Sequence, residues 1–578
     1  MRKTKIICTI GPACDTVDQL KKMIRAGMNV ARLNFSHGTH DGHAATIAAV
    51  RQAAAEENQH IAIMLDTKGP EIRTGKLEQA PVMLSFGEQI TLTTEVIKGT
   101  AERISVSYAN LPQEVRPKDH ILLSDGQIVL EVVSCTDKDI VCRIINGGSL
   151  GENKGVNIPG VRTNMPFLSA HDESDIQFGI EQKVDYIAAS FVRSPEDVLA
   201  LKRRLEEEHA DLGIIAKIES QSALHCLDEI IPLTDGVMVA RGDLGVEIPF
   251  EEVPLVQKDI VQRCSLAGKI VIIATQMLET MIQNPKPTRA EVSDVANAIF
   301  DGADAIMLSG ESAAGKYPLE AVTTMAKIAE RAETSYSYTA LLDARRQQEG
   351  LTVTDAISYA TCATAHKLGI NTILSATNSG NTAKHVAKYR PLADIIAATP
   401  HDSICRKLAL VWGVQPILTH FYGGTDEVLE QSVQVALADG WLHYGDPVVM
   451  TGGDPEGGTN LLKVQVISEI LVRGMGVGKM QVSGEVKCLR HGKEDDEITA
   501  DQIIVCYGAG GLGEGLKNAR GIIAEEGGLT SESAILGMHY QIPVIVGAKN
   551  ATEVLKDGMI ITIDPLQGRV YSGKVPVL

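Results

Sequence analysis

Charged side chains follow two buried strands in the middle of the chain. Lys217 and Glu219 end an apolar run that begins at Ile214. Arg241 and Asp243 follow a second apolar run, DGVMVA. Residues at strand ends of a parallel α/β sheet emerge together at the carboxyl edge, where substrates bind. Two carboxylates beside two cations suit Mg²⁺ holding a phosphate, because this metal takes one or two carboxylates and shares its other positions with phosphate and water. Helix caps and surface ion pairs are the alternative interpretation of any one carboxylate.

Eight short β-branched runs must position these residues. They alternate with amphipathic helical stretches over residues 1–335, which is the pattern of βα units around a parallel sheet and favours a TIM (β/α)8 barrel. We expect the strands at Lys5 to Ile10, Met28 to Leu33, Ile61 to Leu65, Val184 to Ala189, Gly213 to Ile218, Gly236 to Ala240, Ile270 to Ala274 and Ala305 to Leu308. Polar residues end the last seven strands: Arg32, Asn34 and Ser36; Asp66 and Thr67; Ser190; Lys217 and Glu219; Arg241 and Asp243; Thr275 and Gln276; Ser309 and Glu311.

A segment of about 100 residues interrupts the barrel after its third strand. Here the pattern changes to alternating strands and tight turns, as in EQITLTTEV and DIVCRIINGG. This pattern predicts a small all-β domain inserted into a barrel loop. A domain on two linkers above a barrel mouth can act as a lid that excludes water, which favours phosphoryl transfer over hydrolysis.

An open α/β domain follows the barrel and ends near Arg473. Its loop TNSGNT, residues 377–382, lies between a strand and a helix, so hydroxyls and backbone N–H groups could hold a phosphate there. An ordinary N-cap turn is the alternative. Beyond Gly474 comes a glycine-rich, strand-rich unit of about 100 residues. We therefore expect a catalytic barrel at 1–69 and 170–345, a lid at 70–169, an effector domain at 346–473 and an additional domain at 474–578.

Composition limits the classes of partner. A net charge of −19 argues against nucleic acid or an anionic membrane as the main partner, although local cation clusters can still bind anionic metabolites. The 10 cysteines lie singly, without CxxC spacing, which indicates reduced thiols in a cytoplasmic protein. The amino terminus has too short an apolar run for a signal peptide, and no segment of the sequence approaches a membrane span.

Two glycine motifs resemble nucleotide-binding fingerprints without meeting their requirements. The segment from Gly310 to Tyr317 nearly matches a Walker A loop, but Tyr317 replaces the Ser or Thr that coordinates Mg²⁺. The segment from Gly508 to Gly513 has GxGxxG spacing after a strand, but no βαβ unit with a suitably placed ribose-binding acid follows. We expect neither a P-loop nor a nicotinamide site.

Longer motifs resemble the pyruvate kinase family from Lys3 to about Arg473. They are TKIICTIGPA, NVARLNFSHG, LDTKGPEIRTG, GENKGVNIPG, IIAKIES, VMVARGDLGVEI, IATQMLETMI, the segment from PTRAEVSDVANAIF to SGESAAGKYP, and TNSGNTA. The resemblance implies a TIM barrel, a β lid and an effector domain. It also implies a phosphotransferase that moves the phosphoryl group of phosphoenolpyruvate to ADP, giving ATP and pyruvate, the last step of glycolysis.

The resemblance also implies roles for individual residues. Glu219 and Asp243 would bind Mg²⁺ or Mn²⁺, and Lys217 would neutralise the phosphoryl group in transfer. Gly242 and Thr275 would contact the substrate carboxylate, and Thr275 lies where the enolate is protonated. Further implied binding groups are Arg32 and Arg73 for phosphates, Lys154 and Asn34 for the nucleotide, Asn34, Ser36, Asp66 and Thr67 for K⁺, and Thr377, Asn378, Ser379, Gly380 and Thr382 for an effector phosphate. Glu71 matches family members that require K⁺, and the family implies a homotetramer.

The segment after Arg473 departs from the common family pattern. Residues 525–534, EEGGLTSESA, are similar to the swivelling phosphohistidine domain of phosphoenolpyruvate-utilising enzymes, but Glu532 stands where those enzymes have histidine. A dikinase-type phosphotransferase is therefore a second hypothesis, although it needs that histidine and an ATP-grasp domain that we do not find. A third is a catalytically silent sensor of a phosphorylated sugar or nucleotide, against which the complete set of Lys217, Glu219 and Asp243 speaks.

Overall fold

The computed structural model describes residues 1–161, 163–345, 352–421, 423–453, 458–489, 498–510 and 514–575. Two compact units make up the chain. The first comprises Met1–Lys367, Ser375–Val428 and Thr451–Asn460. The second comprises Leu368–Leu374, Leu429–Met450 and Leu461–Leu578.

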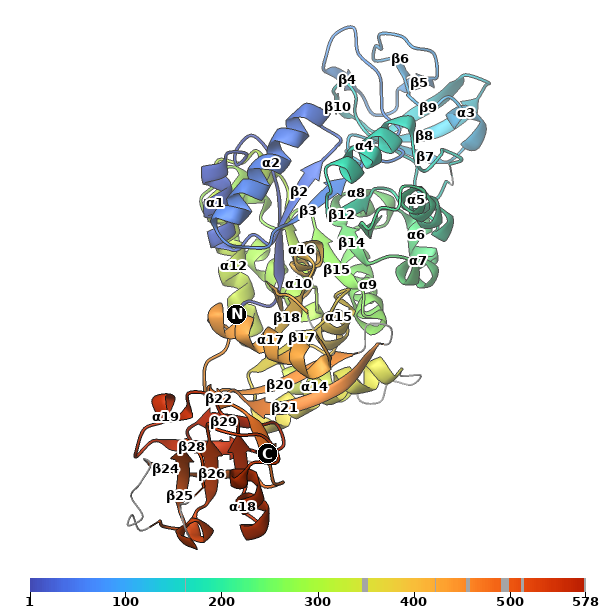
Figure 1. Cartoon of the computed structure of the whole chain (residues 1–578). Coiled ribbons are helices and arrows are strands. Elements are labelled where there is room, and N and C mark those ends of the chain that lie inside the picture. Colours follow the sequence, from blue (N-terminus) through green and yellow to red (C-terminus); the bar gives the residue numbers. More distant parts are fainter. Residues whose placement is uncertain are drawn as a thin grey trace. The chain divides into compact units, whose positions relative to one another are not determined.

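A closed barrel of parallel strands forms the centre of the first unit, in the order β1-β16-β15-β14-β13-β12-β3-β2 (Figure 1). Its strands are β1 Lys5–Thr9, β2 Val30–Asn34, β3 Ala62–Asp66, β12 Tyr186–Ala189, β13 Gly213–Ile218, β14 Gly236–Ala240, β15 Ile270–Ala274 and β16 Ala305–Leu308. All their residues are buried except Asn34, because helices cover the outside and side chains fill the interior. The predicted TIM barrel is confirmed, and the last four strands have the predicted bounds.

Helices surround this barrel with one apolar face each. In α1, for example, Leu20, Met23 and Ile24 recur at helical spacing and are buried. The helices of this part of the chain are α1 Val17–Ala26, α2 His40–Glu56, α4 Ala170–Glu181, α5 Pro195–Glu207, α6 Gln221–His225, α7 Leu227–Leu233, α8 Arg241–Glu247, α9 Val253–Ala267, η1 Glu279–Ile282 (a 3₁₀ helix), α10 Arg289–Asp301, α11 Gly310–Ala313, α12 Pro318–Glu333 and α13 Tyr338–Arg345.

The inserted segment forms the expected β structure. Its six-stranded sheet has the order β11-β7-β8-β9-β5-β6, and β10 pairs with β4. The elements are β4 Val82–Leu84, β5 Gln89–Thr93, β6 Arg103–Ser105, α3 Leu111–Glu114, β7 His120–Leu123, β8 Ile128–Cys135, β9 Asp139–Asn146, β10 Gly148–Leu150 and β11 Val156–Asn157. Both linkers meet at buried Asp172, which accepts hydrogen bonds from the backbone N–H groups of Gly69 at 2.9 Å and Ser169 at 3.0 Å.

A five-stranded sheet follows the barrel in the order β19-β18-β17-β20-β21. Its elements are α14 Val353–Leu368, β17 Thr372–Ala376, α15 Asn381–Lys388, β18 Asp394–Thr399, α16 Asp402–Leu408, β19 Val414–Leu418, α17 Thr425–Ala438, β20 Pro447–Gly453 and β21 Thr459–Val466. The helices alternate with its first strands, as the sequence pattern predicts. The loop at 377–382 joins β17 to α15.

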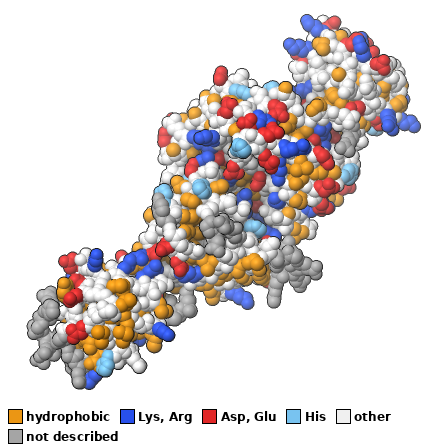
Figure 2. All heavy atoms as spheres, turned by 45° about the vertical axis from the view of Figure 1, so that its right-hand side comes forward, with side chains coloured by type: hydrophobic (Ala, Val, Ile, Leu, Met, Phe, Trp, Pro, Cys, Tyr) orange, Lys and Arg blue, Asp and Glu red, His pale blue; other side chains and the backbone are white. Residues whose placement is uncertain are grey.

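The carboxy-terminal part of the second unit contains a mixed sheet in the order β22-β29-β28-β24-β25-β26-β27-β23. Its elements are β22 Ile470–Arg473, β23 Met475–Val477, β24 Val482–Cys488, β25 Gln502–Cys506, η2 Glu514–Asn518 (a 3₁₀ helix), β26 Gly521–Ala524, α18 Glu532–Tyr540, β27 Val544–Val546, α19 Ala551–Val554, β28 Ile560–Asp564 and β29 Arg569–Ser572. Hydrophobic side chains gather on the face of this domain shown in Figure 2. Large apolar residues at its surface include Met475, Met480, Leu529, Ile535 and Met538.

Candidate active site

Lys217 lies at the centre of a buried polar network in the barrel. It belongs to β13, and its side chain is 11% exposed. Its Nζ lies 2.9 Å from Glu219 Oε1 and 3.1 Å from Asp66 Oδ1, and it donates a hydrogen bond of 2.8 Å to Ser190 Oγ. Burial by itself lowers the pKa of Lys217, but the carboxylates of Asp66 and Glu219 outweigh it and raise that pKa. The ammonium group is therefore charged across the physiological range.

Asp66 links this lysine to Arg32. The strand register sets Asn34 of β2 opposite Asp66 of β3, so the ends of both strands share one edge. Arg32 Nε donates to Asp66 Oδ2 at 2.6 Å, and a second guanidinium nitrogen donates to Thr9 Oγ1 at 2.9 Å. Burial opposes ionisation of Asp66, but Arg32 and Lys217 lower its pKa. One buried carboxylate therefore orients the two cations that the sequence assigns to phosphate.

Buried Glu219 and half-buried Asp243 form a pair of acids beside the lysine. Burial raises the pKa of Glu219 to about 7, with the neighbouring Asp243 adding to the rise and Lys217 opposing it. The pKa of Asp243 is also raised, chiefly by burial. The backbone N–H of Phe191 donates to Glu219 Oε2 at 2.7 Å, whereas Oε1 lies 2.9 Å from Lys217 Nζ.

These two acids fit a divalent cation. Two neighbouring ionised carboxylates repel each other, and a cation between them offsets that repulsion, for which carboxylate oxygens are hard ligands. Among the described residues, no group of three or more His, Cys, Asp and Glu could hold a metal. A site with two carboxylates and the remaining positions left to phosphate and water suits Mg²⁺ or Mn²⁺.

The loop after β15 has a strained backbone at Thr275 and Gln276. Thr275 is one of the residues expected to bind the substrate. Thr275 and Gln276 have φ of 68° and 54°, a conformation that is an outlier for a β-branched residue such as Thr275. The Thr275 hydroxyl donates to Ala274 O at 2.6 Å and accepts from the backbone N–H of Gly242 at 2.8 Å. Strain of this kind is typical of functional sites, where the surroundings hold a side chain in one direction.

Arg241, which follows β14, holds the strained loop in place. Its guanidinium donates to Asp294 at 2.8 Å and to the carbonyl oxygens of Thr275 at 2.8 Å and Gln276 at 3.3 Å. These contacts link the ends of β14 and β15. Glu311 is likewise occupied, because its two oxygens accept from the backbone N–H groups of Leu278 and Ser309.

The residues expected to hold K⁺ lie at the ends of β2 and β3. Asn34 Oδ1 accepts from the backbone N–H of Ser36 at 3.1 Å, and Thr67 Oγ1 accepts from Ser190 N–H at 3.1 Å. Asp66 completes the set, although its carboxylate already contacts Arg32 and Lys217. This cluster of amide, hydroxyl and carboxylate oxygens has the chemistry that a hard monovalent cation requires.

The lid contributes two exposed or half-exposed cations. Arg73 Nε donates to Glu71 at 2.6 Å, and the guanidinium also donates to Asn153 O at 3.0 Å. Glu71 raises the pKa of Arg73 most strongly, and Asp243 of the barrel mouth adds a smaller contribution. Lys154 is exposed, and its backbone N–H donates to Thr74. The structure thus brings Arg73 within electrostatic reach of the acidic pair.

The TNSGNT loop has the geometry of a helix amino terminus. Gly380, with φ of 85°, is the N-cap of α15, and its N–H donates to Thr377 Oγ1 at 3.0 Å. Thr382 Oγ1 accepts a hydrogen bond of 2.9 Å from Thr459. Asn378 and Ser379 are exposed between them. The loop therefore offers two free polar side chains beside the positive end of a helix dipole.

Glu532 of the carboxy-terminal domain stands in a contrasting environment. It is exposed and is the first residue of α18, where the Ser531 side chain caps the helix. The glycine motif that begins at Gly508 ends at Gly513, which lies outside the described residues. The other glycine motif is no phosphate loop, because α11 begins directly at Gly310.

Sequence reasoning did not assign two groups that the structure places in the network. Ser190 lies at a strand end, and its hydroxyl accepts from Lys217 and donates to the Thr67 carbonyl oxygen at 2.6 Å, with Asp66 Oδ1 a more distant acceptor at 3.1 Å. The backbone N–H of Phe191, which has φ of 53°, binds Glu219. The position of Ser190 directly after β12 is a signal for the first, whereas a backbone N–H leaves none in the sequence.

Comparison with known families agrees with this geometry. Residues 1–322 match the family model described as pyruvate kinase, barrel domain, and residues 355–465 match the one described as pyruvate kinase, alpha/beta domain. The chain belongs to the pyruvate kinase family. It is therefore a phosphotransferase. Residues 509–568 match the mobile domain of PEP-utilising enzymes, which confirms the resemblance drawn from EEGGLTSESA.

Pyruvate kinases from other organisms are similar to this chain, some over its whole length and some over part of it. Those from Bacillus licheniformis and Geobacillus stearothermophilus are each 48% identical, and the matches cover 100% of both chains. The crystal structure of a pyruvate kinase from Cryptosporidium parvum is 39% identical with a TM-score of 0.77, covering 80% of this chain and 96% of that one. The bacterial relatives thus extend through the mobile domain, whereas the crystal structure leaves a fifth of the chain without a counterpart.

Proposed function

We propose that the network around Lys217 transfers the phosphoryl group of phosphoenolpyruvate to ADP. The observation that carries the proposal is a buried, charged lysine held between Asp66, Ser190 and Glu219, with Asp243 completing an acidic pair. Phosphoryl transfer needs positioned charge more than covalent catalysis, because the transition state spreads negative charge over the phosphoryl oxygens. A silent sensor has no need to bury this lysine between two carboxylates.

Different residues at the barrel mouth would carry out different parts of the reaction. The bond from phosphorus to the enol oxygen breaks while a bond to a terminal phosphate oxygen of ADP forms, and Lys217 and Arg32 offset the negative charge. Gly242 and Thr275 would hold the substrate carboxylate. The enolate left behind takes a proton at carbon to give pyruvate, a step for which we assign Thr275. Arg73 and Lys154 from the lid, with Asn34, would bind the nucleotide.

Members of this family depend on metal ions, and we assign the ions here to particular residues. Glu219 and Asp243 would hold Mg²⁺ or Mn²⁺, and Asn34, Ser36, Asp66 and Thr67 would hold K⁺. A bound divalent ion would supply positive charge to the oxygens of the substrate. Glu71 supports a K⁺ requirement, as in the family members that it matches.

A coupled assay for pyruvate tests the proposal. Pyruvate should form only when phosphoenolpyruvate, ADP and a divalent cation are all present, and replacing K⁺ with a large organic cation should suppress turnover. Pyruvate formation that requires AMP and pyrophosphate in place of ADP would support a dikinase. Complete inactivity with bound phosphometabolite would support the sensor. Full activity without any small monovalent cation would refute the K⁺ assignment alone.

We also propose that the TNSGNT loop binds the phosphate of a sugar or nucleotide effector. Changing Thr377 and Ser379 together to Ala should abolish activation while leaving the saturated kcat nearly unchanged, because the loop lies outside the barrel mouth. The coupling should be about 1–3 kcal/mol. Effector titrations of both proteins measure it, with Ser337→Ala as a matched control. Activation that survives in the double variant would place the effector site elsewhere.

The domain divisions at 69/70, 169/170, 345/346 and 473/474 remain proposals, as does a homotetramer. Sedimentation analysis would test the assembly state. None of the 10 cysteines, all of which the structure describes, forms a disulfide bond, which supports a reducing, cytoplasmic environment. Among the described helices, none has the length and apolarity that crossing a membrane requires.

The carboxy-terminal domain is proposed to have kept its fold and lost phosphoryl transfer. A carboxylate at Glu532 is a weak nucleophile that repels phosphate, whereas histidine supplies a neutral nitrogen. Arg473 and Arg569 of this domain both pair with Glu430 of α17, and apolar residues such as Ile535 and Met538 are exposed. Ion pairs to α17 and exposed apolar surface support a role in packing or assembly.

A further inference from the structure

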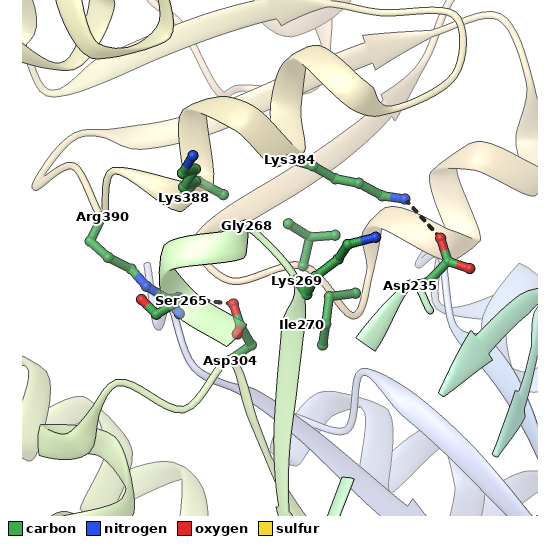
Figure 3. Close-up of a pocket in the computed structure, with 11 residues that line it drawn as sticks. Asp235, Ser265, Gly268, Lys269, Ile270, Asp304, Lys384, Lys388 and Arg390 are labelled. Carbon is green, nitrogen blue, oxygen red and sulfur yellow. Dashed lines mark ion pairs between the residues drawn. The ribbon is translucent and has the colours of Figure 1, made fainter. Parts of the chain in front are cut away.

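A cavity lies at the amino-terminal end of the barrel strands, away from the strand ends that carry Lys217 (Figure 3). Its wall is formed by the starts of β14, β15 and β16, the end of α9 and one face of α15. All of its lining residues belong to the first unit of the chain. The cavity volume is about 30 Å³, which gives room for a small ion.

Positive side chains converge on this cavity from both walls. Lys269 comes from the barrel side, and Lys384, Lys388 and Arg390 come from α15 and the residues just after it. Lys384 and Lys388 are four residues apart and so share one face of the helix, an arrangement of like charges that destabilises an isolated helix. Figure 3 shows Lys269 and Lys384 directed to the same side of the cavity.

Carboxylates offset these charges only in part. Lys384 Nζ lies 3.7 Å from Asp235, Arg390 lies 3.0 Å from Asp304, and Lys388 Nζ lies 3.1 Å from Asp355. Lys269 donates instead to the carbonyl oxygens of Thr234 at 2.6 Å and Pro232 at 3.2 Å. Within the described part of the chain, no carboxylate lies within 4 Å of Lys269 Nζ.

A fifth cation lies behind the cavity wall. The guanidinium of Arg345, 8% exposed, donates to the Ser265 side chain and to the Lys388 carbonyl oxygen. Burial, followed by the charge of Arg390, lowers the pKa of Arg345 to about 10, and burial also lowers the pKa of Lys269. Burial is the main cause of both shifts, and neighbouring cations add to them.

We propose that this cavity is a binding site for a small free oxyanion of the size and charge of inorganic phosphate. The charged residues that line it are Lys269, Lys384, Lys388 and Arg390 against Asp235 and Asp304, a surplus of two positive charges. Arg345 and Asp355, which contact these residues from outside the lining, leave that surplus unchanged. A doubly charged oxyanion neutralises that surplus and accepts hydrogen bonds from ammonium and guanidinium donors. This site is separate from the TNSGNT loop and from the barrel mouth, so it goes beyond the function proposed above.

Calorimetric titration with inorganic phosphate tests the site in the full-length protein at constant ionic strength. Phosphate also binds the barrel mouth and the effector loop, so the comparison is between variants. Lys269→Gln should weaken one class of phosphate site at least tenfold and leave the others unchanged. Lys384→Gln, at a side chain that is 26% exposed and so tolerates replacement, should have the same effect if Lys269→Gln impairs folding. Lys327→Gln, an exposed lysine of α12 outside the cavity, is the matched control.

Crystallography with selenate locates the anion independently, because selenium scatters anomalously. The proposal predicts a selenium peak between Lys269, Lys384 and Arg390 that is absent in the Lys269→Gln protein. It is overturned if both cavity variants titrate like the Lys327→Gln control. It is also overturned if the cavity holds water while selenate occupies other sites.

Discussion

Two glutamates stand at the start of a turn or helix after a strand, Glu219 in the barrel and Glu532 in the carboxy-terminal domain, and their surroundings differ completely. Glu219 is 1% exposed, contacts Lys217 and adjoins a second carboxylate, Asp243. Glu532 is exposed on the first turn of α18. Burial and the like charge of Asp243 raise the pKa of Glu219, and the two neighbouring carboxylates make a metal site the proposal for this part of the barrel. The comparison teaches that residue type alone does not make a site; desolvation and charged neighbours do.

The largest effect should come from removing the lysine of the barrel network. Lys217→Met should lower kcat by roughly 10³-fold or more, a loss of about 4 kcal/mol of transition-state stabilisation, because charge on the phosphoryl group is no longer offset. Steady-state kinetics of pyruvate formation measure it, with Lys327→Met as the control for loss of a lysine elsewhere. Circular dichroism should confirm that the variant is folded. Turnover like that of the unchanged protein would remove Lys217 from the mechanism.

The metal assignment predicts a smaller, concentration-dependent effect. Glu219→Gln should raise the Mg²⁺ concentration for half-maximal activity about tenfold or more, because one of two carboxylate ligands loses its charge. Glu532→Gln is the matched control and should leave the Mg²⁺ titration unchanged. If both variants titrate alike, the acidic pair in the barrel is structural, and the contrast between the two glutamates has no functional meaning.

Because the pKa of Glu219 is raised, Mg²⁺ binding in the barrel should depend on pH. A carboxyl group with a pKa of about 7 is increasingly protonated below that pH, and the proton competes with the metal. The half-saturating Mg²⁺ concentration should therefore rise by up to about tenfold per pH unit below 7 and level off above 8. Metal titrations between pH 6 and 8.5 measure the slope, which should be lost in Glu219→Gln. A constant half-saturating concentration across this range would contradict the protonation of Glu219.

Removing the carboxy-terminal domain should have the smallest effect on catalysis. Because β22 pairs with β29, a shortened chain is best ended at Ser468, before that strand. It should make pyruvate with a similar kcat, with lower thermal stability or an altered effector response, since Glu430 loses both arginine partners. Melting temperature and kcat are measured on the same preparation. A shortened chain that is folded but inactive would show that catalysis requires this domain.

Much of the fold could be predicted because its signals are local. Short β-branched runs are typical of parallel strands, so β13 to β16 were placed with their observed bounds, and the lid was recognised from its change of period. The sequence places the starts of β2 and β12 two residues too early, since apolar residues that precede a strand have the same composition as the strand itself.

The site could be predicted less completely, because side-chain direction depends on partners far away in the chain. Lys217, Glu219 and Asp66 were identified at strand ends, and the barrel brings them into contact. Arg241 looked equivalent to Lys217, yet Asp294 and two carbonyl oxygens turn it toward the loop at Thr275. The cavity cations Lys269 and Lys384 had no signal in the sequence, since they meet only through the packing of α15.

An experiment with labelled phosphoenolpyruvate tests most directly whether phosphoryl transfer occurs at the site around Glu219 without the use of Glu532. The chain is mixed with phosphoenolpyruvate carrying ³²P in its phosphoryl group, in the presence of ADP, Mg²⁺ and K⁺, and the mixture is resolved into nucleotide and protein after a single turnover. The account predicts that all transferred label appears in ATP and none on the protein, in the unchanged chain and in Glu532→Gln alike. A labelled protein intermediate that forms and decays at the rate of turnover, and that disappears in Glu532→Gln, would contradict it.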